Sequence, residues 1–166
     1  MDNSIVLFLL RAIHVVGGVL WVGGVVVVSL FLLPATQALG AEAQPMMGFI
    51  MGRRKLPVYL MTLGILTTLA GLLLMMRNIR LTGGDWARSP MGIGFSIGAT
   101  AAILALIVGM AVSAPTAKRL GPPKPGAAPL TDEQRMALVR RLALGARATL
   151  ILLTISALFM ATARYF

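Results

Sequence analysis

Long apolar runs separated by short polar segments dominate the chain. The first run, IVLFLLRAIHVVGGVLWVGGVVVVSLFLL, covers residues 5–33. Three more runs follow at about 56–76, 91–113 and 132–163. An α-helix rises about 1.5 Å per residue, so each run is long enough to cross a bilayer core of about 30 Å. The pattern predicts an all-α integral membrane protein, in which a single domain forms a four-transmembrane-helix bundle.

Proline and glycine mark the connections between these runs. The segment PATQALGAEAQP at 34–45 is predicted as a loop or a short interfacial piece, because proline lacks the N–H that a helix interior needs. The segment APTAKRLGPPKPGAAPL at 114–130 is rich in both residue types and is predicted as a linker. Thr131 and Gln134 then match a capping box, which marks a helix start. The fourth helix should therefore begin before it enters the membrane.

Small residues recur at helical spacing on the second and third predicted helices. Such stripes let two helix backbones approach closely and are typical of helix packing in membranes. The two stripes consist of Gly64, Thr68 and Gly71 on the second helix, and of Gly94, Gly98 and Ala102 on the third. We expect both stripes to be helix contacts.

Composition supports the same class of protein, and charge adds a predicted orientation. Hydrophobic residues make up 58% of the chain and charged residues 12%, which excludes a soluble globule. Most of the formal net charge of +10 comes from Lys and Arg residues between the apolar runs. At these positions basic residues determine membrane topology. The charge therefore does not indicate nucleic-acid binding. More of them lie in the connections after the first and third helices, where Arg53, Arg54 and Lys55 form a cluster.

This asymmetry predicts that the basic side is cytoplasmic and meets anionic lipids. Both termini should then lie on the non-cytoplasmic side. The membrane is predicted to be a bacterial inner membrane.

The first apolar run contains the one histidine of the chain, His14. On a helix, His14, Gly18 and Trp21 share a narrow stripe, with Arg11 and Gly17 on its flanks. An imidazole without a partner is costly in hydrocarbon. This face should therefore point toward protein or a ligand.

Several interpretations of His14 stay open. A neutral imidazole could hydrogen-bond a Thr hydroxyl or a helix carbonyl and so hold the bundle together. It could instead bind the iron of a b-type haem, either within one chain or shared by two copies across a homodimer axis. Gly17 and Gly18 would then leave room for the porphyrin, Trp21 would form an aromatic wall, and Arg11 would face a propionate. Copper is a further alternative, although the 11 methionines are scattered over several depths.

A second haem ligand is not evident from the sequence. Helix rise places threonines near the depth of His14 on the other helices, at Thr68, Thr100 and Thr154. A hydroxyl is a poor iron ligand. Met75 and Met160 are predicted to lie at shallower depth.

The segments LLRAIHVVGGVLWVGG and GRRKLPVYLMTLGILTTLAGLLLM carry a resemblance to known proteins. They resemble the first two helices of a group of small membrane proteins that includes the membrane domain of copper-resistance protein D and the HemJ-type protoporphyrinogen oxidases. The resemblance spans roughly the first half of the chain, and it implies His14 as a haem ligand. HemJ-type proteins also have a functional lysine in the third helix, and the run 91–113 contains none.

No catalytic constellation can be assembled from the sequence. The chain has no Cys, and four of its five acidic residues fall in terminal or loop positions, with Glu133 opening the fourth helix. We therefore expect a non-catalytic integral membrane subunit that packs into and stabilises a larger respiratory or photosynthetic complex, with other subunits or a second copy as its partners. The alternative is a b-type haem protein for electron transfer or tetrapyrrole handling, with His14 as axial ligand. A copper or small-solute transporter is a third hypothesis.

Overall fold

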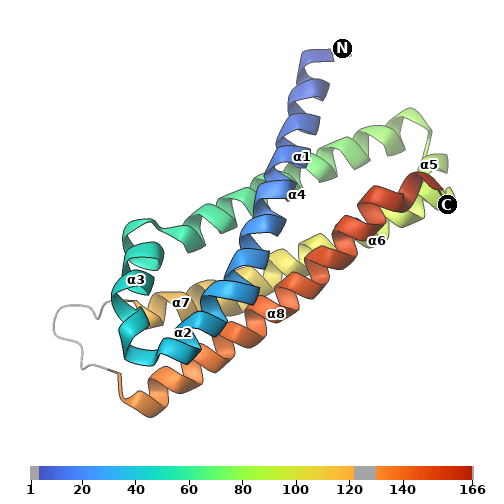
Figure 1. Ribbon diagram of the computed structural model, residues 1–166. Helices are drawn as coiled ribbons and strands as arrows, with labels where there is room; N and C mark the ends of the chain where they lie inside the picture. The colour runs from blue at the N-terminus through green and yellow to red at the C-terminus, as the bar shows by residue number, and fades with distance from the viewer. Residues whose placement is uncertain (1–3, 122–129, 166) are drawn as a thin grey trace.

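The computed structural model describes residues 4–121 and 130–165, and these residues form helices and turns without a β-strand (Figure 1). Four helical segments in this part of the chain are long and apolar enough to cross a membrane. They are Ser4–Arg53, Leu56–Leu81, Pro90–Leu120 and Asp132–Tyr165. The predicted all-α class is confirmed for the described residues, and the four expected spans are matched by four helices of sufficient length and apolar character.

The long segments are divided by short changes of helix type. In chain order the elements are α1 (Ser4–Val27), the π-helical turn η1 (Val28–Leu32), α2 (Leu33–Leu39), the 3-10 turn η2 (Gly40–Ala43), α3 (Gln44–Gly48), the π-helical turn η3 (Phe49–Arg53), α4 (Leu56–Leu81), α5 (Asp85–Arg88), α6 (Pro90–Val108), the π-helical turn η4 (Gly109–Ser113), α7 (Ala114–Leu120), α8 (Asp132–Thr162) and the 3-10 turn η5 (Ala163–Tyr165).

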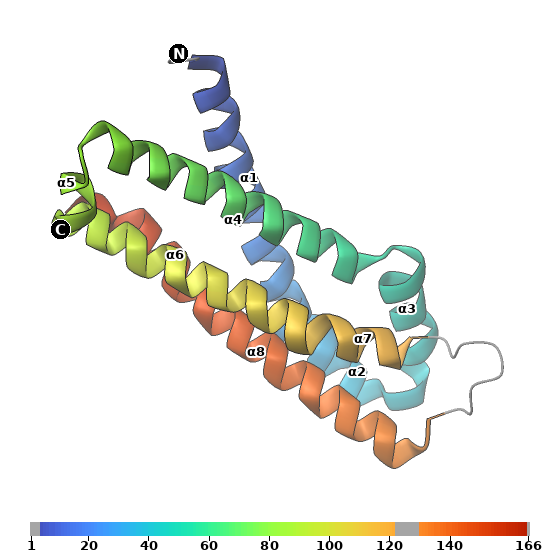
Figure 2. The same cartoon turned by 180° about the vertical axis from the view of Figure 1, so that it is seen from behind.

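The four long helices form two pairs. α1 packs mainly against α4, and α6 packs mainly against α8. The pairs meet in a buried core of Trp21, Val25, Ala105 and Leu153. Beyond this core, Ser29 Oγ donates a 3.2 Å hydrogen bond to the carbonyl of Ala146 on α8. In Figures 1 and 2 the first turns of α1 stand apart from the other helices, so the pairs are in closest contact through the second half of α1.

Glycines bring α1 and α4 close together. A Cβ atom at Gly64 would lie 2.8 Å from Cε2 of Trp21, and a Cβ at Gly17 would lie 2.5 Å from Oγ1 of Thr67. Side chains at these positions would push the two helices apart. Close backbone approach of this kind is the usual role of glycine in membrane helix packing.

The predicted third-helix stripe lies against α8 and the core. A Cβ at Gly98 would lie 3.2 Å from the carbonyl oxygen of Ser156 and from two carbons of the Met160 side chain. Gly94 is buried, and Ala102 packs against the core that contains Trp21. α6 and α8 therefore touch through small residues on α6.

We expect Gly64→Ala to destabilise the bundle. The new methyl group would meet the Trp21 ring, which is 4% exposed, and would lie 3.1 Å from a methyl carbon of Leu106. Overpacking of this kind costs about 1–3 kcal/mol. Thermal unfolding in detergent, followed by circular dichroism, should show a lower midpoint.

Gly23→Ala is the matched control for this substitution. A Cβ at Gly23 would meet nothing within 4 Å, and alanine favours the helix by up to about 1 kcal/mol. Its midpoint should stay constant or rise. A Gly64→Ala protein as stable as Gly23→Ala would contradict the tight packing of α1 on α4.

The loop alternative at 34–45 is wrong, because these residues continue as α2, η2 and the start of α3, and the interfacial alternative stays a prediction. Pro34 occupies one of the first two positions of α2, directly after η1. An N–H at a helix start has no partner in the helix, so proline is tolerated there. The chain turns instead at Gly40, whose φ of 55° suits a residue without a side chain.

The predicted linker at 114–130 is wrong over its first part, because Ala114–Leu120 form α7. Pro115 again stands in one of the first two positions of a helix that follows a π-helical turn. The remainder of this prediction, at 122–129, lies outside the described residues. The capping box is confirmed, since Thr131 and Gln134 exchange two hydrogen bonds of 3.2 Å.

The predicted end of the second helix at 76 is also wrong, because α4 continues to Leu81. The two glycines that end it, Gly83 and Gly84, have positive φ angles of 60° and 97°. Polar residues before them stay helical, since exposed Arg is compatible with a helix. The other two predicted helices agree within one or two residues with α6 plus η4 and with α8.

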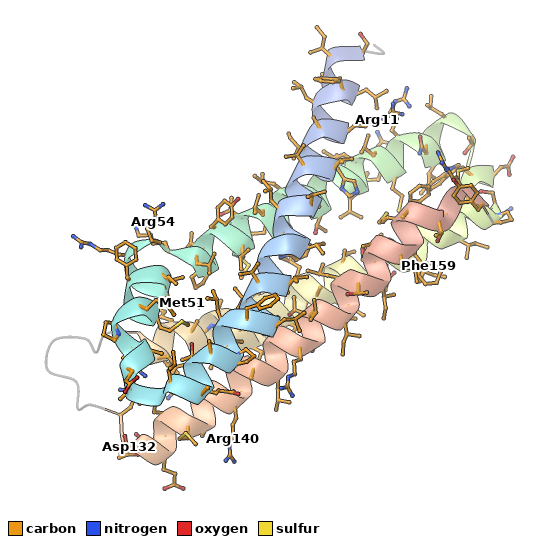
Figure 3. All side chains as sticks on the ribbon, viewed as in Figure 1. Arg11, Met51, Arg54, Asp132, Arg140 and Phe159 are labelled. Atoms are coloured by element: carbon orange, nitrogen blue, oxygen red, sulfur yellow. The ribbon has the colours of Figure 1, made fainter. Side chains whose placement is uncertain are left out.

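Basic side chains gather at the end of the bundle that carries α2, α3 and α7. Figure 3 shows Arg54 and Arg140 at this end and Arg11 at the opposite one. Arg53, Arg54 and Lys55 are all exposed. The predicted orientation in the membrane depends on this excess of basic residues at one end of the bundle. The orientation itself stays a prediction.

Candidate functional site

A cavity of about 860 Å³ lies between the two helix pairs. Pockets for small molecules and cofactors commonly measure about 300–1,000 Å³. The polar or soft side chains on its wall come from α1, α4, α5 and α8, and they are Arg11, His14, Thr67, Thr68, Met75, Asn78, Trp86, Ser156 and Met160. Most of the remaining wall is apolar. The stripe singled out on the first helix thus borders this cavity through Arg11, His14, Gly18 and Trp21.

The His14 imidazole is held by the backbone of α4. Its Nδ1 lies 2.8 Å from the carbonyl oxygen of Thr67. A carbonyl only accepts hydrogen bonds, so Nδ1 must carry the proton and donate it. The other ring nitrogen, Nε2, makes no hydrogen bond with the described residues. The hydrogen bond to a helix carbonyl expected from the sequence is present, and it uses one of the two ring nitrogens.

The His14 ring packs directly on the backbone of Gly71. A Cβ at Gly71 would lie 2.5 Å from Cε1 and 2.8 Å from Nδ1 of His14. The Thr67 carbonyl and the bare backbone of Gly71 are one helical turn apart, and together they fix the orientation of the imidazole. Sequence reasoning placed Gly71 in a packing stripe and missed Thr67. The alternation of three- and four-residue steps from Gly64 to Thr67 to Gly71 was the signal for it.

Some neighbours of His14 on α1 border the cavity, and others pack in the contact between α1 and α4. Gly18 borders the cavity, whereas Gly17 is buried against Thr67 of α4 and does not border it. Gly17 therefore makes room for α4, whereas Gly18 borders the space that a ligand would occupy. Trp21 belongs to the core and also to the cavity wall, and Arg11 is an exposed residue on that wall.

Two hydroxyl groups beside His14 have no hydrogen-bond partner. They are Oγ1 of Thr67 and Oγ1 of Thr68, and both are buried. In α8, by contrast, Thr149 and Thr154 donate to the carbonyls four residues before them, at 2.9 Å each. An unsatisfied buried hydroxyl costs about 1–3 kcal/mol. The wall near His14 therefore keeps unused donors.

Met75 and Met160 border the same cavity as His14. The sequence placed both methionines at a shallower depth than His14, and that estimate assumed helices of equal tilt. α1 crosses the other helices at a steep angle (Figures 1 and 2), so equal distances along the helix axes are not equal depths in the bundle. Trp86 stacks on Phe95 with ring centroids 5.9 Å apart, and both rings contribute to the cavity wall.

Within residues 4–121 and 130–165, no three His, Cys, Asp or Glu side chains come together to hold a metal ion. Comparisons of the chain with protein-family models, with curated proteins and with solved structures find no match. The chemistry of the site thus rests on His14, two methionines and a few polar groups on an apolar wall.

Proposed function

We propose that this protein is an integral membrane protein that binds a b-type haem between its two helix pairs, with His14 as an axial ligand. The observation that supports it most is the state of the imidazole. Its Nδ1–H is donated to the Thr67 carbonyl, and Nε2, which has no hydrogen bond with the described residues, keeps its lone pair on a side chain that borders the cavity. Histidines that bind metals in proteins are held in the same way by a second hydrogen bond.

The remainder of the cavity suits the same cofactor. Its volume and its apolar walls match a large flat hydrophobic group, and Trp21 supplies an aromatic surface at one side. Arg11 is one helical turn from His14 and would pair with a propionate, as a cation beside a carboxylate. The unpartnered Thr68 hydroxyl is a further donor for a propionate oxygen.

When bound, the haem would supply one-electron redox chemistry or be handled as a tetrapyrrole. This chain's residues would hold and orient it. Thr67 and Gly71 position the imidazole of His14, and the apolar side chains of the cavity wall would line the faces of the porphyrin.

An absorption spectrum of the protein purified in mild detergent tests this proposal. Cells supplied with a haem precursor should yield protein with a Soret band and, after reduction with dithionite, sharp α and β bands. The same protein made without haem should take up added haemin. A colourless protein that also takes up no haemin would contradict the proposal.

The proposed location is a bacterial inner membrane, with the basic end of the bundle on the cytoplasmic side and facing anionic lipids. The chain has no Cys, so single introduced cysteines report the side of the membrane. Glu42 and Asp85 are exposed acidic residues toward opposite ends of the bundle, and their substitution leaves the basic residues in place. An impermeant maleimide should label Asp85→Cys in intact cells and Glu42→Cys after lysis alone. The opposite labelling would overturn the orientation.

A second candidate function is a non-catalytic subunit that packs into and stabilises a larger respiratory or photosynthetic membrane complex. The first turns of α1 favour it, because they stand apart from the other described helices (Figure 1) and carry exposed apolar side chains such as Phe8, at 69% exposure. Native mass measurement in mild detergent separates the candidates. Co-purified membrane subunits without haem would favour this second function over the first.

A further inference from the structure

We infer that Met160 is the second axial ligand of the haem, opposite His14; the inference rests on the proposed haem function. Three side chains on the cavity wall are accepted iron ligands in haem proteins: His14, Met75 and Met160. The two axial ligands of a haem lie on opposite faces of the porphyrin. The second ligand must therefore come from the wall across the cavity from His14.

Met75 is on the same wall as His14. It follows Gly71 by one turn of α4, and Gly71 is the residue that the imidazole ring covers. A thioether from this position approaches the cofactor from the histidine side.

Met160 is on the opposite wall, because α8 belongs to the other helix pair. Its side chain lies over Gly98 of α6, where a Cβ would come 3.2 Å from both Cγ and Cε of the methionine. The absence of a side chain at Gly98 makes room for the thioether. Gly98 therefore has a role toward the site besides the contact of α6 with α8.

Methionine opposite histidine has a functional consequence. This ligand pair raises the reduction potential of a haem and occupies the position where an external ligand would bind. Electron transfer is then favoured over tetrapyrrole handling, since no coordination site is left for a substrate.

Met160→Leu tests the assignment, because leucine keeps the apolar volume and removes the sulfur. Haem-loaded Met160→Leu should keep its Soret band but lose the low-spin ferric signal in electron paramagnetic resonance and the thioether charge-transfer band at the red end of the spectrum. Its ferrous form should bind carbon monoxide readily, whereas the parent protein should resist it. Met136→Leu is the matched control on α8, where Met136 is 57% exposed and away from the cavity.

The outcomes separate this inference from the proposed function. A low-spin spectrum that Met160→Leu leaves unchanged would overturn the inference and leave the haem proposal intact. Conversion to high spin by Met75→Leu, with Met160→Leu unchanged, would likewise overturn it and assign the other methionine. A parent protein that takes up no haemin would overturn the proposed function itself. Circular dichroism of each variant identifies any that fails to fold. In that case Met160→Ala with added dimethyl sulfide provides a second test. Return of the low-spin signal on addition of the sulfide would support the inference.

Discussion

His14→Ala should remove the Soret band from the purified protein. Alanine lacks the Nε2 lone pair that we propose as the iron ligand, and no other histidine exists in the chain to replace it. The loss should be close to complete, because one methionine is a weak anchor for haem without the opposite nitrogen ligand. The ratio of Soret absorbance to protein absorbance, measured after the same haem supply, gives the result directly.

Two companion variants make this prediction specific. Val16→Ala is on the same helix, 58% exposed and away from the cavity, so it should bind haem like the parent protein. His14→Gly should regain the Soret band when imidazole is added to the buffer, since free imidazole can occupy the vacated space. Full haem content in His14→Ala would show that the iron, if bound, is held elsewhere.

Gly71→Ala should lower haem affinity while the helices stay folded. The added methyl would come 2.5 Å from Cε1 and 2.8 Å from Nδ1 of His14, so the ring would have to turn and give up its hydrogen bond to Thr67. Loss of a positioning partner of a metal ligand typically weakens metal binding by about 10–100-fold. Haemin titration followed at the Soret band measures the change.

Gly109→Ala is the control for this effect. A Cβ at Gly109 would meet nothing within 4 Å, and the residue does not border the cavity that contains His14. Its haem affinity should equal that of the parent. If Gly71→Ala also retained that affinity, the proposed role of Gly71 in positioning the His14 imidazole would be wrong.

Gly64→Ala and Gly71→Ala distinguish packing from positioning on one helix. Gly64 receives the Trp21 ring and Gly71 receives the His14 ring, so two successive contacts of α1 use the same face of α4. The first substitution should mainly reduce stability and the second should mainly reduce haem binding. Such a division would support α4 as the element that orients both α1 side chains.

Local sequence determines those features that depend on one helix at a time. The apolar runs predict four membrane-spanning segments, because about 20 apolar residues in a helix match the thickness of a bilayer core and a helix satisfies its own backbone hydrogen bonds there. Thr131 and Gln134 predict the start of α8, because both capping hydrogen bonds form within one turn. His14, Gly18 and Trp21 were placed on one face by helix periodicity alone.

The connections between the long helices were harder to predict, because proline can either break a helix or begin one. Pro34 and Pro115 signal a break in the interior of a helix, but a π-helical turn precedes each of them and lets the proline begin a new helix. The neighbouring residues in the sequence do not show whether such a proline breaks a helix or begins a new one.

Only the tertiary structure decided what His14 meets. Its hydrogen-bond partner Thr67 is 53 residues away, and Met160 reaches the same cavity from the last helix. These neighbours depend on how steeply α1 crosses the other helices, and that crossing follows from the contacts of Trp21 with Gly64 and of Gly17 with Thr67. Periodicity orders side chains around one helix axis, whereas the angles and offsets between axes arise from the packing of whole surfaces.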